Sequence, residues 1–91
     1  MSYEDFATRY NKICIKLKND VLDKIYGQNW DLVPARSIEA DLVNHEHRGY
    51  IDELVDIIDY YIRHKDANKD ADFEYNIKEL KSLLNYLENL D

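Results

Sequence analysis

His45 and His47 are the residues that most suggest a metal site, because imidazole nitrogens are common zinc ligands. On a helix, residues two positions apart point about 200° away from each other, so they cannot hold one ion together. We therefore interpret them as solvated histidines near a helix end and expect no metal or other cofactor. His64 stands alone and is expected on the surface at another helix end, where a partly cationic ring suits the helix dipole.

Cys14 is the single cysteine of the chain and therefore the one candidate for a thiol nucleophile. It stands between Ile13 and Leu17 in an apolar row, which favours a buried structural thiol over a reactive one. Gly27 and Gly49 stand singly, so no glycine-rich phosphate loop is present. A small core filled with Leu, Ile and Tyr leaves little room for a substrate pocket. We therefore expect a protein that is not an enzyme.

Repeated carboxylates are the third feature, in the stretch YIDELVDIIDYYIRHKDANKD at positions 50–70. Its apolar residues share one side of a helix at 100° per residue, and charged residues share the other. The charged row has spacings of four, three and four, and it consists of Asp52, Asp56, Asp59 and Arg63. Glu53 and Tyr60 flank this row, and a polar loop follows.

The aspartate row has two interpretations. A charged outer face is ordinary for a helix in a bundle, where it simply faces water. However, aspartate is a poorer helix former than glutamate, and Asp52 and Asp56 repel each other by a few tenths of a kcal/mol. A surface kept despite these penalties is a candidate docking site for a basic partner, and the neighbouring Tyr60 suits an interface.

The net charge of −7 argues against nucleic acid or an anionic membrane as the direct partner. Most of the negative charge lies in residues 37–72, which contain ten acids and four bases. No apolar run has the length of a membrane span, and MSYEDFATRY lacks the layout of a signal peptide. One cysteine fits a reducing cytoplasm. We expect a cytoplasmic protein that is a monomer when free.

The element pattern predicts one all-α domain, residues 1–91, folded as a small antiparallel four-helix bundle. Few glycines and prolines interrupt the chain, which disfavours a many-turned β-fold. Apolar residues spaced by three and four predict helices over about 3–26, 35–47 and 50–64, and a last helix from about Asn76.

Local signals refine these predictions. Ser2 is expected to cap the first helix and Gly27 to end it. Trp30 and Leu32 are expected to fold back onto the core. Arg48-Gly49 is expected to separate the second helix from the third.

The second helix should bury three apolar residues, namely Ile38, Leu42 and Val43. In the last helix, Asn76 and Glu79 fit a capping box. That helix should bury Ile77, Leu80, Leu84 and Leu87, with Leu83 and Leu90 in a second row.

The order of these features resembles the colicin D immunity family, small bacterial proteins that block a tRNA-cleaving toxin. YEDFATRY resembles the opening helix of that family, and KIYG followed by DLVP resembles its first connection. DELVDIIDYYIRHKDANKDAD resembles its acidic third helix and following loop, and EYNIKELKSLLNYL its final helix. These patterns are short, so their order along most of the chain carries the resemblance.

The resemblance implies a four-helix bundle whose acidic side chains occupy the basic catalytic cleft of a nuclease toxin in place of RNA phosphates. Position by position, the acidic helix corresponds to Glu53, Asp56 and Asp59. The acid after it corresponds to Asp66, with Asp70 and Asp72 further along. The stretch IRHKDANKD departs from the family, which has a shorter acid-proline-acid turn there, and its added bases soften the local charge.

The leading hypothesis from the sequence is an immunity protein that binds and blocks a cognate basic nuclease toxin. The predicted contact residues are Asp52, Glu53, Asp56, Asp59, Tyr60, Asp66, Asp70 and Asp72. Two alternatives remain open. One is a small helical adaptor or assembly subunit that docks through an apolar groove, with Tyr26 and Ile62 exposed. The other is a phage-type nucleic-acid mimic that inhibits a host defence protein.

Overall fold

Ser2 starts the first helix, as the sequence predicts. The computed structural model describes residues 1–64 and 72–90. In it, the Ser2 hydroxyl accepts a hydrogen bond of 3.0 Å from the backbone N–H of Asp5. Helix α1 (Tyr3–Leu17) follows and buries its apolar row against the rest of the bundle. Its first turn is acidic, which suits the positive end of the helix dipole.

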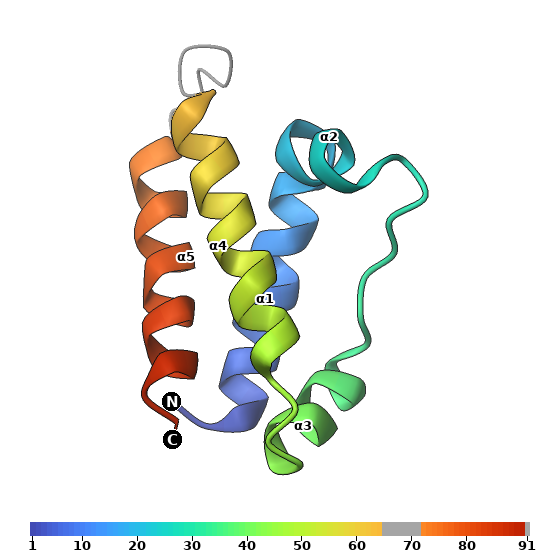
Figure 1. Ribbon diagram of the computed structural model, residues 1–91, viewed down its shortest axis with the longest axis vertical. Helices are drawn as coiled ribbons and strands as arrows, with labels where there is room; N and C mark the ends of the chain where they lie inside the picture. Colours follow the sequence, from blue (N-terminus) through green and yellow to red (C-terminus); the bar gives the residue numbers. More distant parts are fainter. Residues whose placement is uncertain (65–71, 91) are drawn as a thin grey trace.

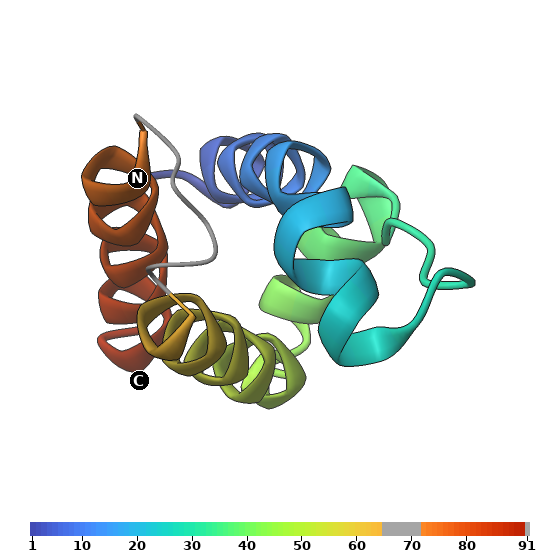
Figure 2. The same ribbon diagram turned by 90° about the horizontal axis from the view of Figure 1, so that it is seen from above.

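The predicted single helix over 3–26 is interrupted. A π-helical segment (Lys18–Leu22) follows α1, and the short helix α2 (Asp23–Tyr26) continues in a different direction (Figures 1 and 2). A π segment holds more residues per turn than an α-helix and so rotates the side chains that follow it. Val21 and Leu22 are both fully buried there. The core therefore selects a bend that the local pattern does not predict.

Gly27 ends α2 with φ = 91°, a region that favours glycine. The connection to helix α3 (Ala35–Val43) then descends along one side of the bundle (Figure 1). Trp30 packs partly buried against the core, as predicted. The prediction for Leu32 is wrong, because that side chain is exposed.

Helix α3 is shorter than the predicted 35–47. Ile38 and Leu42 are fully buried as predicted, but Val43 is 62% exposed at the end of the helix. His45 has a positive φ of 57° and turns the chain. The predicted break at Arg48-Gly49 is wrong, because helix α4 (Arg48–Arg63) begins at Arg48 and both residues lie in its first turn.

Helix α4 (Arg48–Arg63) is followed by α5 (Phe73–Glu88), which begins before the predicted cap at Asn76. Asn76 is fully buried within α5, where its Nδ2 donates a hydrogen bond of 3.2 Å to the Tyr61 hydroxyl. The Phe73 ring meets the Tyr61 ring edge-on, with centroids 4.6 Å apart. The core contact with Tyr61 therefore moves the helix start upstream of the local capping signal.

The helices form the small all-α four-helix bundle that the sequence predicts (Figures 1 and 2). Helix α5 contacts both α1 and α4, the π segment contacts α1 and α4, and α3 covers one end of α1. Aromatic rings fill the space between α1 and α4, where Tyr10 meets Tyr50 edge-on at 5.4 Å. None of the helices in the described part of the chain has the length and apolar character that a membrane crossing requires.

Candidate functional site

The aspartate row lies on the outer face of α4, as the sequence predicts. Asp52, Asp56 and Asp59 are all exposed. Asp59 forms an ion pair of 2.7 Å with Arg63 one turn later, and both side chains are well exposed. Asp52 and Asp56 form no ion pair with the described part of the chain. Exposed pairs stabilise helices by only a few tenths of a kcal/mol, so even Asp59 stays available to a partner.

The opposite face of α4 holds this row in place. Its apolar residues are buried in the core, and they are Tyr50, Leu54, Ile57, Ile58 and Tyr61. A helix fixed along its whole buried face presents its outer carboxylates in one arrangement. Binding then requires little ordering of this backbone, which favours affinity.

Tyr60 lies beside the row and is half-buried. Its ring stacks on His64, with ring centroids 4.1 Å apart and planes inclined by 28°. His64 is exposed at the end of α4, as predicted. The two stacked rings lie at one end of the aspartate row.

Glu53 is separated from the exposed acids. Its side chain is partly buried, and no hydrogen bond from residues 1–64 or 72–90 reaches its buried Oε1. Burial raises the pKa of the Glu53 carboxyl, and the charge of Asp56 adds to this effect. Tyr10 and Trp30 lie beside the carboxylate and oppose the rise in pKa. The structure thus directs Glu53 toward α1 and the 27–34 connection.

Replacement of Glu53 by glutamine should stabilise the fold at neutral pH. A carboxyl whose folded pKa is raised contributes stability below its ordinary pKa, and this contribution is lost as pH rises through the folded pKa. Glu53→Gln should therefore raise the free energy of unfolding at pH 7 by up to about 1 kcal/mol, after allowance for solvent screening. Near pH 4, about the ordinary pKa of glutamate, the two proteins should be equally stable.

Urea unfolding followed by circular dichroism at both pH values measures this difference. Glu46→Gln, at an exposed position, controls for the loss of one negative charge. A Glu53→Gln variant less stable than the parent at neutral pH would show that the ionised carboxylate is stabilised in place, against our interpretation.

Of the three predicted contact acids after α4, the structure describes Asp72, which does not extend the aspartate row. Asp72 lies at the start of α5, where its Oδ2 is 2.9 Å from the Lys16 Nζ of α1. It therefore neutralises part of the α1 surface. Asp66 and Asp70 lie outside the described residues.

The residues that could suggest catalysis or metal binding lie in surroundings that do not favour either role. Cys14 is buried, and burial together with the charge of Glu53 raises the pKa of its thiol to about 12. The thiolate nucleophile is therefore scarce at neutral pH. His45 is exposed as predicted, but the prediction for His47 is wrong, because its ring is buried next to the start of α4. In the described part of the chain, no three His, Cys, Asp or Glu residues lie together as metal ligands.

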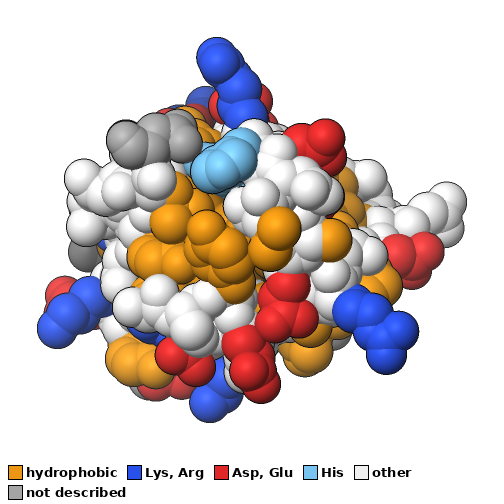
Figure 3. Space-filling model, turned by 90° about the horizontal axis from the view of Figure 1, so that it is seen from below, with side chains coloured by type: hydrophobic (Ala, Val, Ile, Leu, Met, Phe, Trp, Pro, Cys, Tyr) orange, Lys and Arg blue, Asp and Glu red, His pale blue; other side chains and the backbone are white. Residues whose placement is uncertain are grey.

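Two further surface features escaped the sequence analysis. One is a hollow between α1 and α5 that is lined by basic side chains of α1. The spacing of Arg9, Lys12 and Lys16 by three and four was its sequence signal, since it places them on one helix face. The other is an apolar patch at the end of the bundle where α3 lies (Figure 3). Separately, Val43, the last residue of α3, has an exposed side chain.

No protein-family model, no curated protein and no solved structure matches the chain. The resemblance to the colicin D immunity family stays a prediction from short sequence patterns. The molecule presents three distinct surfaces that a ligand or partner could contact: the aspartate row of α4, the basic hollow and the apolar end.

Proposed function

We propose that this protein is an inhibitor that binds the basic active-site cleft of a nuclease toxin through the aspartate row of α4. The observation that carries the proposal is that Asp52, Asp56 and Asp59 are exposed together on one rigid helix. Two of these carboxylates lack an internal cation in the described part of the chain. They are free to accept charge-assisted hydrogen bonds from a partner's lysines and arginines.

The inhibitory mechanism is competition for phosphate-binding groups. The cationic side chains that hold the RNA backbone in a nuclease cleft can also form ion pairs with carboxylates. Along α4, the rise of about 1.5 Å per residue separates Asp52 from Asp56 by about 6 Å, and Asp56 from Asp59 by about 4.5 Å. A basic cleft can therefore contact several of these carboxylates at once, and substrate is excluded from the same groups.

Electrostatic attraction also speeds the encounter. A partner with a basic cleft and this chain of net charge −7 attract each other at long range, which raises the association rate at low salt. The stacked Tyr60 and His64 rings beside the row offer an aromatic contact that slows dissociation. The protein then acts by binding, with no chemical step of its own.

A salt series tests the proposed electrostatic docking. The reading frames next to this gene are first searched for a toxin that ends in a basic domain. That domain, once purified, is the probe, and calorimetry measures its dissociation constant. We expect sub-micromolar binding at low salt that weakens steadily as salt screens the contact. Absence of binding at low salt, or an affinity independent of salt, would contradict docking through the aspartate row.

The apolar end of the bundle favours a second candidate function, a helical adaptor that docks through apolar surface (Figure 3). Apolar clusters on a surface often mark contact sites, and Val43 is an exposed apolar residue at the end of α3. This function predicts a complex that salt does not weaken and that Val43→Ser disrupts. The aspartate variants would then leave the complex intact.

A further inference from the structure

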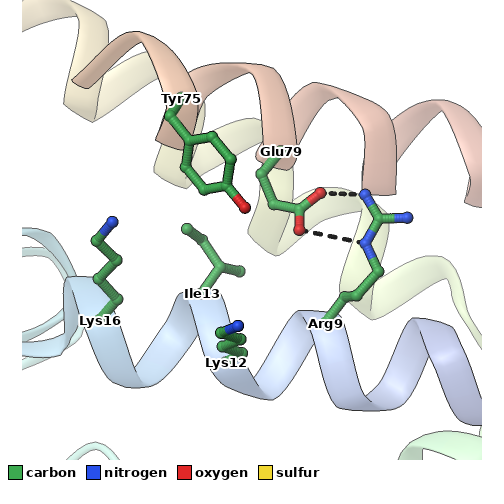
Figure 4. A pocket seen from close by; sticks show the side chains of 6 residues that line it. All are labelled: Arg9, Lys12, Ile13, Lys16, Tyr75 and Glu79. Carbon is green, nitrogen blue, oxygen red and sulfur yellow. Dashed lines mark hydrogen bonds and ion pairs between the residues drawn. The ribbon is translucent and has the colours of Figure 1, made fainter. Parts of the chain in front are cut away.

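A hollow of about 210 Å³ lies between α1 and α5 (Figure 4). Three cationic side chains of α1, spaced by three and four, stand along it, and α5 supplies an aromatic ring and one carboxylate. Ile13, which is almost fully buried, forms an apolar base between the two helices. The lining residues are Arg9, Lys12, Ile13, Lys16, Tyr75 and Glu79.

Arg9 neutralises the one carboxylate among the described residues of this lining. Its guanidinium binds both carboxylate oxygens of Glu79, with Nε 3.2 Å from Oε2 and Nη2 against Oε1 (Figure 4). Such two-pronged pairs are the strongest and best oriented of the protein ion pairs. The remaining charge of the hollow therefore comes from lysines.

Lys12 supplies that positive charge, because Lys16 is paired with Asp72. Lys16 contacts Asp72 at 2.9 Å, and its Nζ lies 5.4 Å from the centre of the Tyr75 ring. Lys12 is exposed and forms no ion pair with the described part of the chain. An ammonium group beside a hollow, without an internal anion, is a recognition group for an external anion. This local positive charge contrasts with the net charge of −7.

Tyr75 adds an aromatic surface to the lysines. Its side chain is 62% exposed, although tyrosine rings are more often buried in small domains. A second hollow of about 390 Å³ shares Arg9, Tyr75 and Glu79 with the first, and it adds Lys78 and Ser82. Tyr75 therefore lines both hollows, and each hollow is also lined by lysine. Together the hollows offer space for a ligand larger than a single ion.

We propose that this groove binds a small phosphorylated ligand with a planar ring, of the nucleoside monophosphate class. Lys12 contacts its phosphate, and Tyr75 provides the surface on which its base stacks. Base stacking on aromatic side chains and lysine contacts with phosphate are the two interactions that such ligands use. The inference is independent of the aspartate row, because its residues come from α1 and α5.

The overall charge selects for a short ligand. A long nucleic acid extends over the acidic surface and is repelled by it. For a mononucleotide, the repulsion by acidic side chains more than about 8–10 Å away is screened at physiological salt. Attraction by the nearby lysines of the groove is then the larger electrostatic effect. We therefore expect the affinity to fall as nucleotides are added to the ligand.

A nuclear magnetic resonance titration of the full chain with AMP tests the site. We expect saturable shifts of the amide signals of Lys12 and Tyr75, with a dissociation constant in the high micromolar to millimolar range. Adenosine and inorganic phosphate, as separate probes, should each bind more weakly than AMP, because each lacks one of the two contacts. Equal shifts with inorganic phosphate alone would reduce the site to a simple anion contact and overturn the proposal.

Matched variants separate this site from general charge effects. Lys12→Gln and Tyr75→Ala should each weaken AMP binding about tenfold. Lys24→Gln, an exposed lysine of α2, should leave it unchanged. All three positions are exposed, so circular dichroism should show an intact fold. Equal weakening by Lys24→Gln, or no saturable shift in the groove, would overturn the site.

The same variants distinguish this inference from the proposed function. Lys12→Gln should leave binding to a basic nuclease domain undiminished, and Asp56→Asn should leave AMP binding undiminished. Either surface can thus fail its test without affecting the other.

Discussion

The triple substitution of Asp52, Asp56 and Asp59 by asparagine will weaken the complex with the basic nuclease domain by about 100-fold. A loss of this size corresponds to about 2.7 kcal/mol, or slightly less than 1 kcal/mol for each charged contact. The loss should appear in both rates, because neutral amides attract a basic cleft less strongly and hold its cations less tightly. Calorimetry and surface plasmon resonance at low salt measure the two effects.

The fold should tolerate this triple substitution. All three side chains are exposed, and asparagine and aspartate have similar helix propensities. Removal of the repulsion between Asp52 and Asp56 should even favour the helix slightly. Unchanged helical circular dichroism would confirm that a loss of binding comes from the surface.

A second triple variant with the same change in net charge controls for long-range attraction. Asp20→Asn, Asp31→Asn and Glu88→Gln remove three exposed acids outside α4. This variant should slow association slightly and leave dissociation unchanged. Equal losses in both triple variants would assign the effect to net charge and refute a defined docking surface on α4.

In cells that produce the toxin, the α4 triple variant should no longer protect, whereas the control variant should. The cellular test requires that both variants accumulate to the same level as the parent. If the α4 variant protects the cells at that level, inhibition through the aspartate row is wrong.

Leu83→Ala should lower the free energy of unfolding by about 3 kcal/mol, whereas Leu84→Ala should lower it by about 1 kcal/mol. Leu83 is fully buried in α5, but Leu84 is only partly buried. Removal of a fully buried leucine side chain loses its transfer free energy and leaves a cavity. At the half-buried position, water and neighbouring side chains fill much of the space.

The pair is internally matched, because both changes are leucine to alanine at adjacent positions of one helix. The gain in helix propensity therefore cancels between them. Urea unfolding at neutral pH measures both, and equal slopes with denaturant would show that the denatured states are comparable. A larger loss from Leu84→Ala would support the apolar pattern read from the sequence and contradict the packing of α5.

The amphipathic pattern predicted the architecture well, because helix periodicity is a local property of the chain. The acidic row of α4, the buried Cys14 and the Ser2 cap all follow from neighbours a few residues away. The sequence predicted the helix boundaries less accurately. The end of α3 and the start of α5 depend on the turn at His45 and the core position of Asn76, and the nearby capping signals suggested different ends.

Glu53 and Asp56 show what local pattern could not decide. They lie on the same helix, and the sequence placed both in the acidic surface. The structure buries part of Glu53, because α1 and the 27–34 connection cover that side of α4, whereas it leaves Asp56 in water. Which side of a helix is covered depends on the neighbouring elements, so sequence periodicity alone does not separate the two acids.

The sequence by itself determined that four amphipathic helices form one bundle with carboxylates along the outside of the third. Hydrophobic burial requires this, because each apolar stripe must meet another. Tertiary structure alone decided that Lys12 and Tyr75 border one hollow and that Leu83 is more deeply buried than Leu84. These relations depend on how α5 lies against α1 and α4, and packing between distant segments sets that arrangement.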